Sequence, residues 1–109
     1  MEWRLRNDEG RLVAAPTGRV DEESWKEFSA NLNAAVRDAV AASVPLVIDL
    51  SGLEYMTSKG LRALTLAKNE ARGAVQIRLA APNATMRRIL SISRYDMLFP
   101  VVDSVDSGD

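Results

Sequence analysis

The chain contains neither cysteine nor histidine among its 109 residues. The absence of cysteine excludes disulfides and thiolate chemistry, and the absence of histidine removes the side chain that most often acts as a general base near neutral pH. A serine hydrolase of the usual kind is therefore excluded, because its nucleophile needs such a base. This composition favours a binding protein over a catalyst.

Neither sign of charge is in excess, because 14 Lys and Arg residues face 15 Asp and Glu residues, for a net charge of −1. No uniform field is therefore expected to attract nucleic acid or an anionic membrane surface. Hydrophobic runs are too short for a membrane span, and the N-terminus lacks the apolar core of a signal peptide. We expect a cytoplasmic protein that contacts neither nucleic acid nor membrane directly.

Phosphate-binding glycine loops are also missing: neither G-x-G-x-x-G nor G-x-x-x-x-G-K-[ST] occurs. A phosphoaspartate receiver domain would need an acidic pair to hold a metal at the end of its first strand, and Asp49 stands alone. We therefore expect no enzymatic activity, no cofactor and no metal. The length predicts one domain over residues 1–109 with a core of its own.

The first part of the chain has the pattern of a β-hairpin. Residues 3–6 and 11–15 are candidate strands, and the Asn7-Asp8-Glu9-Gly10 sequence between them has the composition of a turn. The following Pro16-Thr17-Gly18 sequence is expected to end the second strand. We predict that the two strands pair antiparallel.

Helices and strands then alternate. Asp21 is expected as the N-cap of a helix whose apolar residues recur every three or four positions, and residues 44–50 read as the central strand. The pattern predicts a single α/β domain, a mixed sheet of about five strands packed with helices, with antiparallel N-terminal strands and later βαβ units. The later elements are expected at 58–71 (helix), 75–80 (strand), 83–92 (helix) and 99–102 (strand), before a polar tail at 103–109 that we expect to fray.

The most informative stretch is residues 50–62, LSGLEYMTSKGLR, which leads from a buried strand through a turn into a helix. Ser58 is expected at the helix N-cap with its hydroxyl exposed, and the amides of the first helical turn also favour a phosphate there. Serine is equally a favoured cap that needs no function. The local chemistry therefore leaves a structural and a regulatory role open.

Residues 47–61, VIDLSGLEYMTSKGL, resemble the signature of STAS domains, the family of sulfate-transporter cytoplasmic domains and bacterial anti-sigma factor antagonists. Gly18 and Asp21 also stand where this family has its link between second strand and first helix. The resemblance implies a protein that sequesters an anti-sigma factor and releases it when phosphorylated. It further implies that the anti-sigma factor is a serine kinase with a histidine-kinase-like ATPase fold, and that a metal-dependent serine phosphatase acts on the modified protein; homodimerisation stays open.

The resemblance is carried over residue by residue. Ser58 and Gly60 match the phosphoacceptor serine and the later glycine of the family pattern. Thr57 replaces an aspartate found in many antagonists and is an alternative acceptor, while Lys59 could pair with a phosphate or simply be solvated. The predicted partner-binding residues are Asp21, Thr57, Ser58, Lys59, Gly60 and Arg62.

The departures at Thr57 and Lys59 keep two alternatives open. One is a STAS-type scaffold or sensory interaction module that is never phosphorylated. The other is a partner-switching regulator of a pathway that does not involve a sigma factor. The sequence does not separate these outputs from sigma-factor control.

Overall fold

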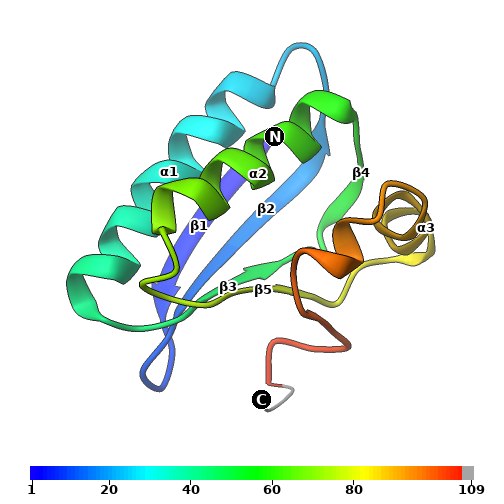
Figure 1. Cartoon of the computed structure of the whole chain (residues 1–109). Helices are drawn as coiled ribbons and strands as arrows, with labels where there is room; N and C mark the ends of the chain where they lie inside the picture. The colour runs from blue at the N-terminus through cyan, green and yellow to red at the C-terminus, as the bar shows by residue number, and fades with distance from the viewer. Residues whose placement is uncertain (107–109) are drawn as a thin grey trace.

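A six-stranded mixed β-sheet forms the centre of the computed structural model, which describes residues 1–106. The strand order is β1-β2-β3-β5-β6, and β4 pairs with β2. Helices α1 and α2 lie side by side over one face of the sheet, and α3 lies beside β4 (Figure 1). The elements are β1 (Glu2–Asn7), β2 (Leu12–Val20), α1 (Trp25–Ala42), β3 (Leu46–Asp49), β4 (Leu53–Met56), α2 (Ser58–Ala71), β5 (Ile77–Ala80), α3 (Ala84–Ile92), the 3-10 turn η1 (Tyr95–Met97) and β6 (Val101–Val102).

The predicted hairpin is confirmed. Strands β1 and β2 pair antiparallel, and the turn closes with a hydrogen bond of 2.9 Å from the Asp8 amide to the Arg11 carbonyl. Every other strand pair among the described residues is parallel, with helices in the connections, as expected for βαβ units. The α/β class with a mixed sheet is therefore confirmed.

The expected strand break at Pro16-Thr17-Gly18 is wrong, because β2 continues through it to Val20. Gly18 has a φ of 94°, and the pairing register shifts between Gly18 and Arg19. A bulge at a glycine bends a strand and adds a residue without ending it. The glycine thus lets β2 reach far enough to pair with β3 along its first half and with β4 along its second.

Strand β4 is the element that the periodicity missed, so the sheet has six strands and not the expected five. Only the two ends of β4 are buried, and its middle residues, Glu54 and Tyr55, are exposed or half-buried. A strand this short and this mixed has no clear alternation. Strands β3 and β4 thus pair with successive halves of β2, which brings the carboxyl ends of β2 and β4 to the same end of the sheet.

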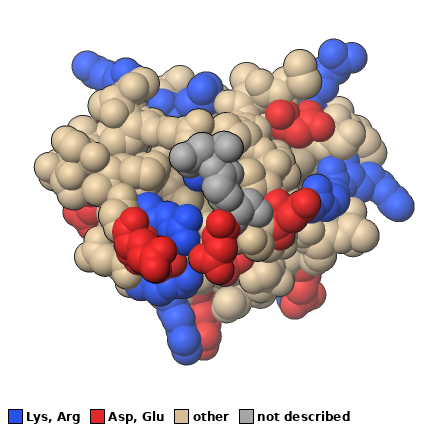
Figure 2. All heavy atoms as spheres, turned by 90° about the horizontal axis from the view of Figure 1, so that it is seen from below, with Lys and Arg blue, Asp and Glu red and all other residues tan. Residues whose placement is uncertain are grey.

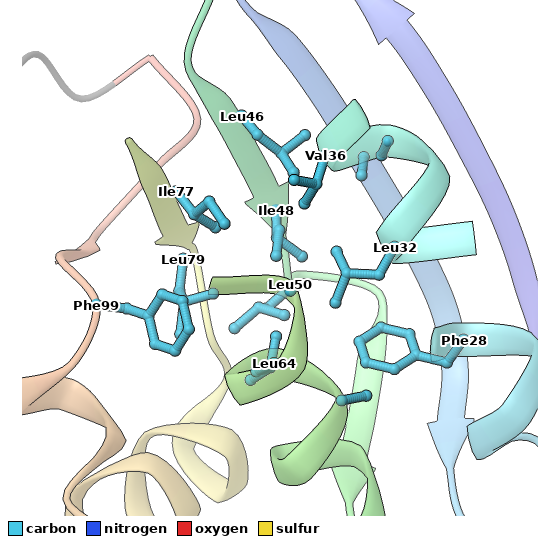
Figure 3. Packing of buried hydrophobic residues seen from close by; sticks show 14 of the residues in the cluster. Phe28, Leu32, Val36, Leu46, Ile48, Leu50, Leu64, Ile77, Leu79 and Phe99 are labelled. Atoms are coloured by element: carbon cyan, nitrogen blue, oxygen red, sulfur yellow. The ribbon is translucent and has the colours of Figure 1, made fainter. Parts of the chain in front are cut away.

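The main core lies between the sheet and the two long helices (Figure 3). Strand β3 is central, between β2 and β5, although it spans 46–49 and not the predicted 44–50. Its residues alternate, so that Leu46 and Ile48 face the helices while Val47 belongs to a smaller cluster on the other side. Fully buried side chains of the main core include Phe28, Leu32 and Val36 from α1, Leu64 from α2 and Leu79 from β5.

Residues 103–106 of the tail, which we expect to fray, make contacts with the rest of the chain. Asp103 pairs with Arg87 at 2.8 Å and Asp106 with Arg11 at 3.0 Å, while Val105 packs against the smaller hydrophobic cluster. Two ion pairs and one apolar contact therefore place this segment, and residues 107–109 lie outside the described residues.

Acidic and basic side chains are interspersed on the face seen from below (Figure 2), in agreement with the net charge of −1. Such mixing leaves no large field of one sign on this face. Within residues 1–106, no helix combines the length and the apolar character needed to cross a membrane.

Candidate functional site

The predicted site lies at the end of the sheet where β2 and β4 finish and where α1 and α2 begin (Figure 1). The backbone joins the two segments directly, because the Thr57 amide donates a 2.9 Å hydrogen bond to the Val20 carbonyl. In open α/β sheets the carboxyl ends of parallel strands are the usual place for binding sites. Sequence positions near 20 and near 58 therefore become parts of one surface.

The expected position of Ser58 is off by one residue: Thr57 is the N-cap of α2, and Ser58 is the first helical residue. Thr57 keeps the extended backbone of the preceding strand, with φ −84° and ψ 177°, so the helix begins one position later. The Ser58 side chain is exposed, whereas the Thr57 Oγ1 atom is buried without a hydrogen-bond partner among the described residues. The two candidate hydroxyls therefore differ sharply in access.

Gly60 lets α2 approach the ends of both strands. A Cβ atom at this buried position would lie 2.6 Å from Met56 Cγ and 2.9 Å from Val20 Cγ1. Those separations are too short for non-bonded carbon atoms, so any side chain here would displace the helix or its neighbours. Gly60 thus belongs to the support of the site and is not available to a partner.

Lys59 is not simply solvated, as the sequence allowed. Its Nζ lies 3.0 Å from Glu22 Oε2 and 5.1 Å from the centre of the Trp25 ring. Because the Lys59 and Glu22 side chains are 47% and 70% exposed, the ion pair contributes little to stability. Its consequence is positional: the Lys59 side chain links the start of α2 to the loop before α1.

Asp21 shapes that loop but is not the N-cap of α1, which is Ser24. Its Oδ1 accepts hydrogen bonds from the amides of Glu23 at 3.0 Å and Ser24 at 3.2 Å, so the backbone forms a turn before the helix begins. The Glu23 amide is the main cause that lowers the pKa of Asp21, with Ser24 and Arg19 adding to it. Asp21 is thus committed to the loop as a carboxylate.

Arg62 lies one helical turn after Ser58 on α2, and both residues are exposed. Within residues 1–106 Arg62 forms no ion pair, in contrast to Lys59. The structure therefore brings Thr57, Ser58, Lys59 and the Asp21 loop together, with Arg62 extending the same surface along α2. The arrangement leaves the Ser58 residue exposed on the surface, with the basic residues Lys59 and Arg62 after it on α2. No cluster of three potential metal-ligating acidic side chains occurs within residues 1–106.

Asn83 is a supporting residue that the sequence analysis did not identify. Its Oδ1 accepts from the Met86 amide at 2.7 Å, and its Nδ2 donates to the Leu53 carbonyl at 2.9 Å. The first bond caps α3, and the second attaches α3 to β4 and so supports the strand that leads to Ser58. An asparagine before a helical pattern predicts the cap, but the bond to β4 had no signal because β4 itself was not predicted.

Comparisons with known proteins agree over almost the entire chain. The family described as "Mlab, STAS domain" matches residues 3–102. BtrV of Bordetella bronchiseptica, provisionally named an anti-sigma factor antagonist, is 29% identical over 101 residues, which cover 92% of this chain and 84% of that protein.

Two solved structures are similar in fold. An anti-sigma factor antagonist from Mycobacterium paratuberculosis is 25% identical, with a TM-score of 0.85, over 96% of this chain and 87% of that one. The Bacillus cell fate determinant SpoIIAA in its phosphorylated form is 19% identical, with a TM-score of 0.68, over 96% of this chain and 93% of that one. At this identity SpoIIAA shows a shared fold alone.

Proposed function

We propose that this chain, which belongs to the STAS domain family, is an anti-sigma factor antagonist that binds an anti-sigma factor through the surface around Ser58. The names of BtrV and of the mycobacterial protein support this assignment, since each is similar along most of its length. The observation on which the proposal depends is the exposed serine at the first residue of α2, where both long helices begin.

Ser58 is the proposed phosphoacceptor. A kinase active site must reach the oxygen atom that it modifies, and the buried Thr57 Oγ1 does not meet this requirement while the domain is folded. In the reaction, the γ-phosphoryl group of ATP bonds to Ser58 Oγ, the hydroxyl proton leaves to a base of the kinase, and ADP departs. The phosphorylated form of SpoIIAA supports the proposal to the extent that a protein of the same fold can carry a phosphate.

Phosphorylation at this position should change binding and leave the domain folded. The phosphate adds about −1.5 to −2 charges, and the start of a helix tolerates negative charge. An interface that closed over an unpaired dianion would instead lose several kcal/mol to desolvation, and each ~1.4 kcal/mol weakens binding about tenfold. The modified protein is thus expected to release its partner.

The partner that fits this cycle is an anti-sigma factor that is also a serine kinase with a histidine-kinase-like ATPase fold. A metal-dependent serine phosphatase would restore the unmodified protein. The chain itself acts as a binding module in this scheme, because its serine needs activation by a base from another protein.

The test compares the partner affinity of the wild type, Ser58→Ala and Ser58→Asp, with the kinase encoded in the same genome neighbourhood as binding partner. We expect Ser58→Ala to bind like the wild type and Ser58→Asp to bind about tenfold more weakly or worse. Incubation with the kinase and ATP should modify Ser58, as mapped by mass spectrometry, and Thr57→Val should be modified normally.

Equal affinity of all three proteins would contradict the switch and favour a module that is not regulated by phosphorylation. Binding to a kinase that controls no sigma factor would retain the switch and assign it to another pathway.

A further inference from the structure

We propose that Arg62 binds the phosphate of phosphorylated Ser58 within the same molecule. The inference rests on the proposed phosphorylation of Ser58 and adds the residue that receives the new charge. It starts from the position of two exposed side chains on α2, four residues apart, of which the second is an arginine without an ion pair within residues 1–106.

Helix geometry places the two side chains next to each other. Residues four apart on an α-helix are neighbours, with Cβ atoms about 5–6 Å apart, and an anion that precedes its cation is the favourable order. The opposite side of α2 is committed to the core, where Gly60, Ala63, Leu64, Ala67 and Ala71 are buried. Ser58 and Arg62 therefore share the solvent-facing side of one helix.

Lys59 is the competing cation, and the structure disfavours it. Its ammonium lies 3.0 Å from Glu22 and 5.1 Å from the centre of the Trp25 ring, so a phosphate would have to compete with these contacts for it. Adjacent residues also do not face each other on a helix. Arg62 has no such contacts to lose, and a guanidinium matches a phosphate with two parallel hydrogen bonds.

This contact would make phosphorylation change the partner-binding surface in two ways. The phosphate adds negative charge at Ser58, and at the same time the Arg62 guanidinium turns to the phosphate and is withdrawn from a partner. An acidic group on the partner that paired with Arg62 would lose its counter-charge and meet a dianion instead. Lys59 stays with Glu22, so the loop before α1 keeps its place.

The contact can be tested without kinase or partner, in full-length protein with phosphoserine installed at position 58 during translation. Phosphorus NMR would follow the second ionisation of the phosphate in this protein and in the Arg62→Gln and Lys59→Gln variants. A nearby cation favours the dianion, so we expect Arg62→Gln to raise the phosphate pKa by about 0.15–0.4 unit. Lys59→Gln is the matched control and should change it by much less. Circular dichroism would check that each variant is folded.

A second readout is the Nε–H resonance of Arg62, which should shift when phosphoserine replaces Ser58 and return when the phosphate is removed. The proposal is overturned if Lys59→Gln raises the phosphate pKa as much as Arg62→Gln does, or if the Arg62 resonance does not respond. Failure of the proposed function looks different: the phosphorylated protein would keep its partner affinity while the contact between phosphate and Arg62 was still present.

Discussion

The starts of α2 and α3 have nearly the same backbone conformation but differ in the hydrogen bonds of their N-cap side chains. Thr57 and Asn83 are both N-caps in extended conformation, with φ and ψ of −84° and 177° at Thr57 and −72° and 177° at Asn83. The Asn83 side chain caps its helix and also bonds to β4, whereas the Thr57 side chain makes no capping bond. One helix start is thus fixed by its own side chain, and the other is held by its surroundings.

This difference explains how a site can be both rigid and accessible. The start of α2 is placed by backbone contact with β2 and by close packing at Gly60, not by a side-chain cap. The outer side of its first turn therefore stays open for a modification at Ser58. The start of α3 instead uses its polar side chain for attachment, through hydrogen bonds to Met86 and to Leu53 of β4.

The largest effect is expected from Gly60→Ala, which would disturb the close approach that places α2. The new methyl group would overlap Met56 and Val20, so we expect the free energy of unfolding to fall by about 1–3 kcal/mol, even though alanine favours helices. Urea denaturation would measure it. Ser58→Ala, an exposed change two residues earlier on the same helix, is the control and should stay within about 0.5 kcal/mol of the wild type. A Gly60→Ala protein as stable as Ser58→Ala would show that packing does not fix α2.

The next effect is expected from Asn83→Ala, which removes the cap of α3 and its bond to β4. The loss should be about 1–2 kcal/mol in the free energy of unfolding. Thr85→Ala, an exposed change in the first turn of the same helix, is the control and should cost about 0.5 kcal/mol at most. Equal losses of unfolding free energy in the two variants would mean that the Asn83 side chain does not stabilise the start of α3. The difference between Asn83 and Thr57 would then not affect stability.

The smallest effect, and one of opposite sign, is expected from Thr57→Val. Valine has nearly the shape of threonine and lacks the buried Oγ1 that has no partner, so stability should be unchanged or rise by up to about 1 kcal/mol. The matched variant is Thr65→Val. The Thr65 hydroxyl lies 2.7 Å from Tyr95 Oη, so its removal should lower the free energy of unfolding by about 1 kcal/mol. Destabilisation by Thr57→Val as large as that by Thr65→Val would show that the Thr57 hydroxyl has a partner after all.

Elements with strong periodicity could be predicted from the sequence, and elements defined by their neighbours could not. The helix at 58–71 agrees with α2 at both ends, and the hairpin and central strand are present as predicted. Strand β4 was missed because its pattern is short and mixed, and the extent of β2 was missed because Gly18 permits a bulge where the sequence reads as a break.

The candidate site shows the same division. An exposed serine at a helix start was predictable from the local motif and from the family resemblance. The ion pair of Lys59 with Glu22 was not, since it joins residues 37 positions apart that meet only because β2 and β4 end side by side. The N-cap positions, Thr57 for α2 and Ser24 for α1, were also not predicted. They depend on the residue at which the preceding strand or loop ends and the helix begins.

The order of hydrophobic and polar residues by itself determined that this chain forms a mixed α/β domain and that a hydroxyl stands at the start of its second helix. Those properties follow from local periodicity and turn chemistry, which a sequence contains directly. Only the tertiary structure decided that the neighbouring Thr57 hydroxyl is buried, and that Lys59 forms an ion pair while Arg62 does not. Burial and pairing depend on which distant segments come into contact, and the parallel pairing of β2 with β4 sets those contacts here.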